Sequence, residues 1–393
     1  MAKQPLKKKE VEKSSFKSFK TKTGLTNVQN ADKPLSWLVM PTGYQEALKL
    51  PGIPEGYVTD IVGHSNVGKS TIINHAIVGA QEKGRIPVIY DTENNFDFTY
   101  AINMGFKAEP IYNEVEEEIV DIETGEVKIV KVNKLMGYDG DFLYFNNTLL
   151  ADRYGDFDYS QGKTVKTKRT VAVIEDIAAS INELLDAQDS GEIDADFLFV
   201  WDSVGSIGSF KSYKSHVGNN MFDAGAISAA FQSIINHRIP GSRKVLSPHI
   251  NTMVLINKVW LDSMTNPVSP PSLSLKGGNS IFYASRLIIL LGGQLKASTK
   301  KLIATSSGAN YNYGIETKIK VLKNQLPAPY TITYEGTVLC TAHGMLAPNE
   351  LEAYKKSHIA DILKQLKDMI KNGVEINESD IVFSSEDDDS VVG

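Results

Sequence analysis

The sequence predicts an α/β protein built on a mostly parallel sheet that is covered by helices on both faces. Short strands rich in Val, Ile and Leu alternate with helical segments along most of the chain. A glycine-rich turn joins the first of these strands to the first of these helices. With 393 residues, of which 42% are hydrophobic, the chain is long enough to bury a full core.

The elements are predicted from their hydrophobic periodicity and from the glycines that end them. In chain order we expect a strand at 57–63, a helix at 71–84, a strand at 87–93, a helix at 96–105, a hairpin at 116–132, a strand at 141–148, a polar loop at 151–168, a helix at 171–191, a strand at 197–203, a helix at 224–238, and strands at 252–258, 284–293, 314–324 and 330–339. The acidic hairpin and the polar loop interrupt the alternation. We expect both to be surface insertions. The acidic hairpin is expected to be simply solvated, and the alternative is that it repels DNA or binds a basic partner.

The two ends of the chain differ from the core in charge. The whole chain carries −6, but residues 1–23 hold eight Lys against two Glu, which gives +6, and residues 375–393 hold seven acidic residues and no Lys or Arg. We therefore expect a basic flexible arm at 1–35, a core at 36–346 with an insertion at about 111–168, and a C-terminal region at 347–393. That region is predicted as a helix at 350–373 followed by an acidic tail.

Cysteine and hydropathy exclude several classes of protein. The single cysteine, Cys340, cannot form an intramolecular disulfide or a cysteine-based zinc site, and the seven histidines lack metal-ligand spacing. No apolar run reaches the length of a membrane span, and no apolar segment follows the basic N-terminus. A cytoplasmic protein without a membrane partner is expected.

A phosphate-binding loop is predicted at 63–70. The segment GHSNVGKS fits G-x-x-x-x-G-K-[ST] and lies between a predicted strand and a predicted helix, where that pattern must lie. Backbone N–H groups in such a loop surround phosphates, the lysine reaches the β- and γ-phosphates, and the Ser hydroxyl can bind Mg²⁺. The predicted ATP-binding residues are Gly63, His64, Ser65, Asn66, Val67, Gly68, Lys69, Ser70 and Thr71.

Two acidic residues follow strands that end at the same edge of the predicted sheet. Asp202 ends the apolar run FLFVWDS and is expected to hold Mg²⁺ together with Ser70. Glu93 ends PVIYDTE, where its carboxylate can accept a proton from water. A simple turn or helix-cap role is the alternative for each.

Several segments resemble the RecA family of strand-exchange ATPases, especially the phage-type recombinases related to UvsX. MPTGYQEALKLPGIPEGYVTDIVGHSNVGKST resembles the family's entry to the phosphate-binding loop, and YDTENNFDFTYAINMG resembles the segment of its catalytic glutamate, which falls on Glu93. The family's adenine-contacting residues fall on Asp97 and Tyr100. FLFVWDSVGSI, GGNSIFYASRL (277–287) and KVLKNQLPAPY (320–330) resemble later family motifs. Two departures are Lys258, where many members have Gln, and Gln325, which leaves Lys323 as the charge that would reach a neighbouring subunit's ATP.

The resemblance implies an ATP- and Mg²⁺-dependent recombinase that forms a helical filament on single-stranded DNA and pairs it with double-stranded DNA. Glu93, Lys69 and Lys323 would be catalytic. Two mobile loops, at about 209–225 and 259–276, would bind DNA, and single-strand-binding and mediator proteins are candidate partners. The residues implied to contact DNA are Lys211, Lys214, His216, Val217, Trp260, Leu261, Met264, Lys276, Gly277, Gly278 and Asn279.

Two other functions remain open at this point. A ring-forming replicative helicase uses the same type of core, but it usually adds a helical N-terminal domain, whereas this chain begins with a short polar arm. A DNA-annealing or mediator module could keep the phosphate-binding loop for assembly alone, although the presence of Glu93 argues against it.

Overall fold

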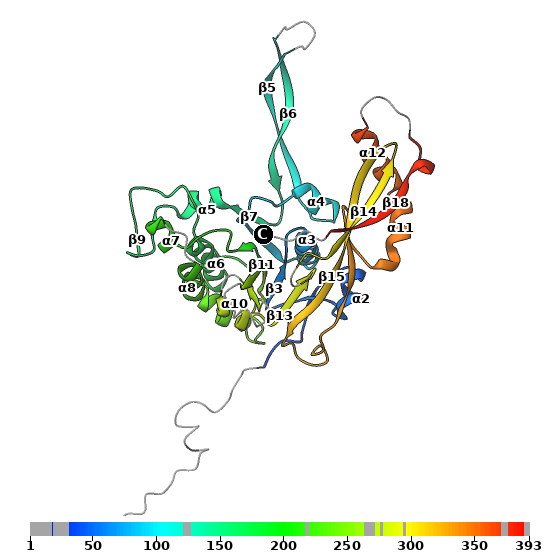
Figure 1. Cartoon of the computed structure of the whole chain (residues 1–393). Helices are drawn as coiled ribbons and strands as arrows, with labels where there is room; N and C mark the ends of the chain where they lie inside the picture. The colour runs from blue at the N-terminus through cyan, green and yellow to red at the C-terminus, as the bar shows by residue number, and fades with distance from the viewer. Residues whose placement is uncertain are drawn as a thin grey trace, which may run out of the picture.

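The computed structural model describes Ser18 and residues 31–120, 127–216, 220–262, 272–275, 278–293, 296–370 and 376–388 (Figure 1). The two Phe residues of the basic arm, Phe16 and Phe19, lie outside these ranges, as do Val217, Met264, Lys276 and Gly277. In the described part of the chain, no helix is both long and apolar enough to cross a membrane.

One large sheet organises the molecule, and its central part is parallel as predicted. Six strands are hydrogen-bonded side by side and all run in the same direction. In spatial order these strands are β7 (Leu143–Asn146), β4 (Ile86–Asp91), β10 (Phe197–Val204), β11 (Thr252–Asp262), β3 (Val58–Gly63) and β13 (Leu287–Leu291). Because these strands are parallel, their carboxyl ends lie at one edge of the sheet.

Beyond β13 the sheet becomes antiparallel. The strands of this part are β15 (Ala309–Asn324), β16 (Glu335–Thr341), β17 (Gly344–Leu346), β14 (Thr299–Ser306) and β18 (Val382–Asp388). A short strand, β12 (Ser272–Leu275), pairs with the end of β11. The strand predicted at 330–339 starts only at Glu335, and β14 has no counterpart among the predicted strands.

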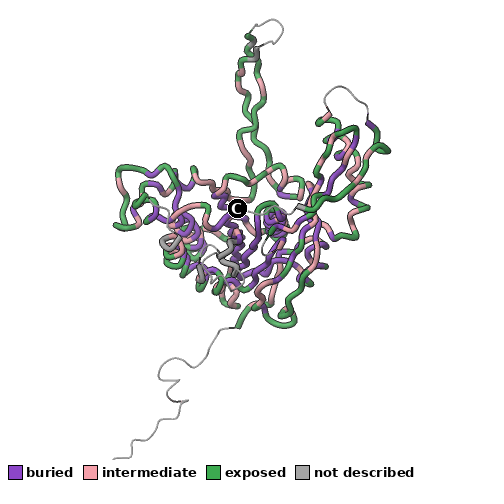
Figure 2. The backbone as a smooth tube through the Cα atoms, in the orientation of Figure 1, coloured by how far each residue is buried: buried purple, intermediate pink, exposed green. Residues whose placement is uncertain are grey.

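Helices cover both faces of the parallel strands, and the buried residues gather between these layers (Figure 2). One face packs against α2 (Thr42–Leu48), α3 (Lys69–Glu82) and α4 (Phe98–Asn103). The other face packs against α6 (Ile174–Asp189), α8 (Asn220–Ala230) and α10 (Gly278–Ala284). The helix predicted at 224–238 is divided, because a π-helical turn at Ile234–Arg238 and the short α9 (Ile239–Gly241) follow α8.

The acidic hairpin is longer than predicted and projects from the body of the molecule (Figure 1). Its strands are β5 (Glu109–Val120) and β6 (Val127–Asp139). Exposed ion pairs join them, with Lys131 2.7 Å from Glu114 and Lys134 2.9 Å from Glu117. At the root of the hairpin, Tyr138 of β6 stacks on Phe98 of α4 with ring centroids 4.4 Å apart, which attaches the hairpin to the body of the protein.

The polar loop predicted at 151–168 is wrong, because this segment has regular structure. It contains the end of α5 (Asn147–Tyr154) and a small antiparallel pair, β8 (Phe157–Asp158) and β9 (Lys163–Thr164). The Asn146 side chain caps α5 by accepting a hydrogen bond of 2.9 Å from Leu149 N. Asp158 Oδ1 fixes the turn between β8 and β9 by accepting bonds from the backbone N–H groups of Ser160 and Gln161.

The C-terminal region differs from its prediction in two ways. The helix predicted at 350–373 is broken at His358 into α11 (Leu351–Ser357) and α12 (Ile359–Met369), after a 3₁₀ turn at Pro348–Glu350. The free acidic tail is wrong for Val382–Asp388, because these residues form β18 after a 3₁₀ turn at Glu378–Asp380. Glu386 and Asp387 of β18 lie opposite Lys301 and Lys300 of β14, and cross-strand pairs of opposite charge favour this register.

The core begins before residue 36. Backbone N–H of Lys33 donates to Arg243 O at 2.7 Å, and its Nζ donates to Ser242 O at 3.0 Å and to His249 O at 2.7 Å. The next elements are the paired strands β1 (Trp37–Val39) and β2 (Gly52–Pro54). The segment 31–35, which was assigned to the arm, is therefore attached to the core.

Candidate active site

The phosphate-binding loop lies at the carboxyl edge of the parallel strands, between β3 and α3. Gly68, with φ +94°, is the residue immediately before α3, and a Cβ there would lie 2.5 Å from Cys340 Sγ. Gly63 is equally confined, since a Cβ there would lie 2.7 Å from Leu291 O. Both glycines are thus required by close contacts with neighbouring strands, and they let the backbone bend into a concave loop.

Lys69 is buried at the start of α3, with only 8% of its surface exposed. Its Nζ donates to Gly63 O at 3.1 Å and to His64 O, so the amine points back into the concave side of the loop. Burial lowers the pKa of Lys69 to about 8, although the negative charge of Asp202 opposes this shift. An anionic phosphate beside Nζ would stabilise its charged form.

Glu93 lies beyond the carboxyl end of β4 and contacts two groups from other strands. Its Oε1 lies 2.8 Å from Lys258 Nζ and also accepts a hydrogen bond from Ser203 Oγ. Among the described residues, its Oε2 has one long contact, of 3.4 Å, with Asn95 Nδ2. Burial raises the pKa of the Glu93 carboxyl, but the bonds from Lys258 and Ser203 outweigh this effect and hold the pKa below its usual value. Glu93 is therefore ionised at neutral pH.

The turn that carries Glu93 is fixed by Asp91, the last residue of β4. The Asp91 carboxylate accepts bonds from Asn95 N at 3.0 Å, from Phe96 N at 2.9 Å and from the Tyr144 hydroxyl at 2.8 Å. Asp91 was not among the predicted site residues.

Asp202 lies on β10 opposite Asp91 of β4, so the structure places it at the same edge as Glu93. Burial raises the pKa of Asp202 to about 7, and the charges of Glu93 and Asp91 add to the effect. A divalent cation would reverse this penalty. In the described residues, no group of three His, Cys, Asp or Glu side chains could hold a metal ion by itself. Mg²⁺ bound by Ser70 and Asp202 would therefore need further oxygen ligands from the substrate, as is usual for Mg²⁺ with nucleotides.

A second buried carboxylate lies below the loop and was not predicted. Asp60 of β3 is fully buried and accepts hydrogen bonds of 3.0 and 2.9 Å from Asn257 Nδ2 on β11. Burial raises the pKa of Asp60 to about 7. This pair joins the strand that leads into the phosphate-binding loop to the residue that precedes Lys258.

A cavity of about 350 Å³ adjoins the loop and is lined by Gly68, Thr71 and Tyr100, together with residues of β15 and β16. The Tyr100 hydroxyl donates to Thr341 O at 3.0 Å and lies 2.8 Å from Thr71 Oγ1. Asp97 does not line the cavity. It caps α4 by accepting a bond of 2.9 Å from Tyr100 N, so its role is to position the helix that carries Tyr100.

The first segment implied to bind DNA follows β10, and its described residues form helices where a loop was predicted. Its first half forms α7 (Phe210–Ser215), which Ser209 caps, and α8 starts at Asn220. Asp223 joins the two helices by accepting bonds from Ser209 N at 2.8 Å and Ser212 Oγ at 2.7 Å. Lys211, Lys214 and His216 are exposed on this segment.

The second segment implied to bind DNA leaves the same edge of the sheet, at the end of β11. Trp260 and Leu261 belong to β11 and pair with Ser274 and Leu273 of β12. Gly278 and Asn279 begin α10. Lys258 therefore lies both beside Glu93 and immediately before this hairpin.

Lys323 does not reach the phosphate-binding loop of its own chain. Ile288 of β13 pairs with Lys323 and with Asp60, whereas Leu291 pairs with Gly63, so Lys323 lies three residues, about 10 Å, down the sheet from the loop. Its Nζ donates to Phe282 O at 2.5 Å and to Tyr283 O at 3.2 Å. The side chain lies at the surface formed by α10 and β15.

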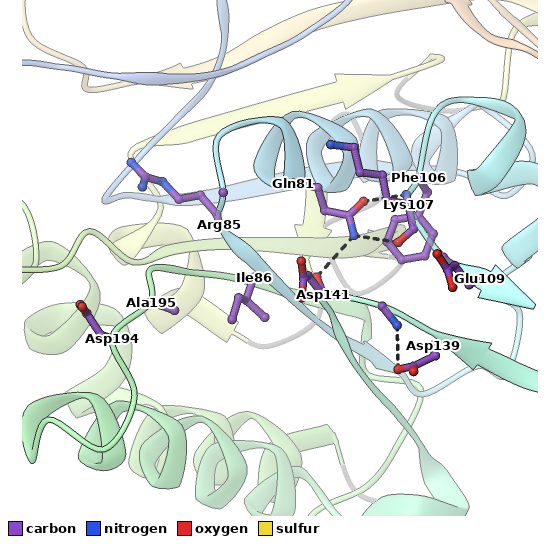
Figure 3. Close-up of a pocket in the computed structure, with 13 residues that line it drawn as sticks. Gln81, Arg85, Ile86, Phe106, Lys107, Glu109, Asp139, Asp141, Asp194 and Ala195 are labelled. Carbon is purple, nitrogen blue, oxygen red and sulfur yellow. Dashed lines mark hydrogen bonds between the residues drawn. The ribbon is translucent and has the colours of Figure 1, made fainter.

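A larger cavity, of about 800 Å³, lies at the opposite edge of the sheet (Figure 3). Ile86 at the start of β4 and Ala195 before β10 line it. Gln81 of α3 donates to Lys107 O at 3.1 Å and accepts from Lys107 N at 2.8 Å, which ties the base of the hairpin to α3. Ligands of parallel sheets bind at the carboxyl ends of the strands, so this cavity is not the candidate active site.

Comparisons with known proteins agree with this geometry over part of the chain. The model of the RecA N-terminal domain matches residues 16–134, which include the phosphate-binding loop and Glu93. Protein RecA of Bifidobacterium breve is 30% identical over 137 residues, which are 32% of this chain and 33% of the relative. The RecA proteins of Chlorobaculum parvum and Chlorobaculum tepidum are 37% and 35% identical over 97 residues, which are 23% of this chain and 28% of each relative. The chain thus spans about a third or less of the length of these relatives, and the similarity supports a relationship to RecA in the nucleotide-binding part.

Proposed function

We propose that this protein is an ATP-dependent recombinase that forms filaments on single-stranded DNA and promotes homologous pairing and strand exchange. The observation that carries the proposal is that Lys69, Glu93 and Asp202 lie at the edge of the sheet where β10 and β11 lead into the two segments implied to bind DNA. The partial similarity to RecA supports the same activity. The finer resemblance to UvsX-like phage recombinases rests on the sequence motifs alone.

ATP is the proposed substrate and Mg²⁺ the proposed cofactor. The confined glycines, the buried Lys69 amine and the cavity beside Tyr100 fit a triphosphate and a base. Ser70 and Asp202 would hold Mg²⁺, which when bound neutralises charge on the phosphates. Lys69 would stabilise the charge that develops on the transferred phosphoryl group.

Glu93 is the proposed acceptor of the proton from the attacking water. Its ionised state suits this role, and its Oε2 has only one long contact. Lys258 and Ser203 are proposed to orient the carboxylate through Oε1.

Lys258 also connects hydrolysis to DNA. It contacts Glu93 and immediately precedes the β11–β12 hairpin, so a shift of the hairpin on DNA would alter the position of Lys258. Lys323 is proposed to contact the ATP of a neighbouring subunit, because it is too far from the loop of its own chain. A filament would supply that neighbour.

Negative-stain electron microscopy combined with a strand-exchange assay tests the proposal. With ATP, Mg²⁺ and single-stranded DNA, we expect helical filaments and transfer of a labelled strand from a homologous duplex. Lys323→Ala should bind ATP but assemble poorly, and Lys318→Ala, which alters the same strand, is its control. Closed rings that unwind duplex DNA would instead indicate a helicase, and annealing without ATP turnover would indicate a mediator module.

A further inference from the structure

The small β8–β9 pair and its flanking residues, 156–169, form a strap that packs against α7. Lys214 Nζ of α7 donates to Asp158 Oδ2 at 2.7 Å and to Ser160 Oγ at 3.0 Å. The rings of Tyr159 and Phe210 are in edge contact, with centroids 5.6 Å apart. The strap is therefore fixed to the first segment implied to bind DNA.

The C-terminal end of the strap is anchored to α6. The guanidinium of Arg169 donates to both oxygens of Asp176 on α6 at 2.8 and 2.9 Å, and both side chains are buried. The Tyr159 hydroxyl donates to the same carboxylate at 2.9 Å. The strap thus has a defined position on the body of the protein.

The register of the strap directs a second lysine toward α7. Lys163 lies directly opposite Asp158, so the two side chains share one face of the pair, and Asp158 shows that this face meets Lys214. Lys163 is exposed and makes no ion pair with the described residues. On α7, Lys211 and Lys214 are three residues apart and share one side of the helix.

The strap and α7 carry more positive than negative charge. Residues 156–169 include Lys163, Lys166, Lys168 and Arg169 against Asp156 and Asp158, and residues 209–216 contain two Lys and no acidic residue. Arg169 is occupied by Asp176, and Lys168 donates to Asp152 O. Lys163 is left exposed on the face of the pair that meets α7, and Lys166 is exposed three residues further along the strap, so both would attract a polyanion.

We infer that the strap and α7 together form a phosphate-binding surface for the backbone of DNA, to which Lys163 and Lys166 contribute directly. This inference rests on the proposed function and adds to it the strap, which lies outside the two implied loops. Asp158 holds Lys214 in place at the cost of one negative charge on the surface.

Fluorescence anisotropy tests the inference. The full chain is titrated onto a fluorescein-labelled poly(dT) oligonucleotide at several salt concentrations, with a slowly hydrolysed ATP analogue and Mg²⁺. For Lys163→Ala/Lys166→Ala, we expect weaker binding and a log–log salt slope that is smaller by about 0.7 for each lost phosphate contact. Lys364→Ala/Lys367→Ala removes the same charge from exposed positions of α12 and should bind like the wild type. Asp158→Asn should bind more tightly, because it removes the negative charge and keeps an oxygen acceptor for Lys214.

Two results would overturn the inference and are distinguishable from failure of the proposed function. Wild-type affinity and slope in Lys163→Ala/Lys166→Ala, while the wild type itself binds DNA, would remove the strap from the DNA surface and leave the recombinase proposal intact. Equal losses in that variant and in Asp158→Asn would show that the fold of the strap matters and its charge does not. Absence of DNA binding by the wild type would reject the inference and the proposed function together.

Discussion

Gly68→Ala should destabilise the protein in two separable ways. The backbone of Gly68 has φ +94°, where a residue with a Cβ costs about 1–3 kcal/mol. The new Cβ would also lie 2.5 Å from Cys340 Sγ, and such overpacking costs about 1–3 kcal/mol. The free energy of unfolding should therefore fall by about 2–6 kcal/mol.

A double-mutant cycle with Cys340→Ala separates the two costs. Without Sγ, the nearest remaining atoms are Cys340 Cβ at 3.4 Å and Leu291 Cδ2 at 3.6 Å, so only the backbone cost of Gly68→Ala should remain. Urea unfolding, followed by the fluorescence of the buried Trp201, gives the free energy of unfolding of each protein. The cycle requires that the wild type, the two single variants and the double variant have the same m value. A coupling energy of about 1–3 kcal/mol is expected. The same cost for Gly68→Ala in both backgrounds would show that the loop does not pack on Cys340 in this way.

Three further predictions concern the site and the C-terminal strand. Lys258→Met should raise the pKa of Glu93, because it removes a bond that lowers this pKa. The acid limb of the pH profile for ATP hydrolysis should therefore move to higher pH, and Lys258→Arg is the matched control. An acid limb that does not move in Lys258→Met would contradict the pairing of Lys258 with Glu93. Asp202 becomes ionised as the pH rises through about 7, so the Mg²⁺ concentration needed for half-maximal hydrolysis by the wild type should fall between pH 6 and 8. A similar fall in Asp202→Asn would argue against Asp202 as a metal ligand. Truncation after Asp380 should lower the free energy of unfolding by about 2 kcal/mol or more, since it removes Phe383 from its contact with Tyr313. Glu386→Gln/Asp387→Asn should cost less than about 1 kcal/mol in the same urea titration. A larger cost for the charge variant than for the truncation would show that charge, and not strand packing, holds this segment.

The parts of the site that could be predicted from sequence have local signals. The phosphate-binding loop is a contiguous motif between a strand and a helix. Glu93 follows β4 and Asp202 lies near the end of β10, so the parallel pairing of these strands brings both residues to one edge. The partners of Glu93 carry no such signal. Ser203 is 110 residues away in sequence, and its contact depends on the order of strands in the sheet.

The errors in the predicted fold have physical causes of the same kind. The acidic end was interpreted as a free tail from its composition, but Lys300 and Lys301 of β14 offer a strand edge of opposite charge. The segment 151–168 was interpreted as a loop from its Asp, Gly and Tyr content, yet Asn146 and Asp158 use the same polar side chains to cap a helix and a turn. The composition of these segments shows that they are acidic or polar, but it does not show which residues they contact in the folded protein.

ATP hydrolysis by the full chain, measured with and without single-stranded DNA, tests most directly whether the edge of the sheet is a DNA-dependent ATPase site. The wild type should hydrolyse ATP faster when DNA is present, and Lys69→Ala should lose this stimulated activity while it remains folded by circular dichroism. Full DNA-stimulated hydrolysis by Lys69→Ala, or hydrolysis by the wild type that does not respond to DNA, would contradict the proposed mechanism.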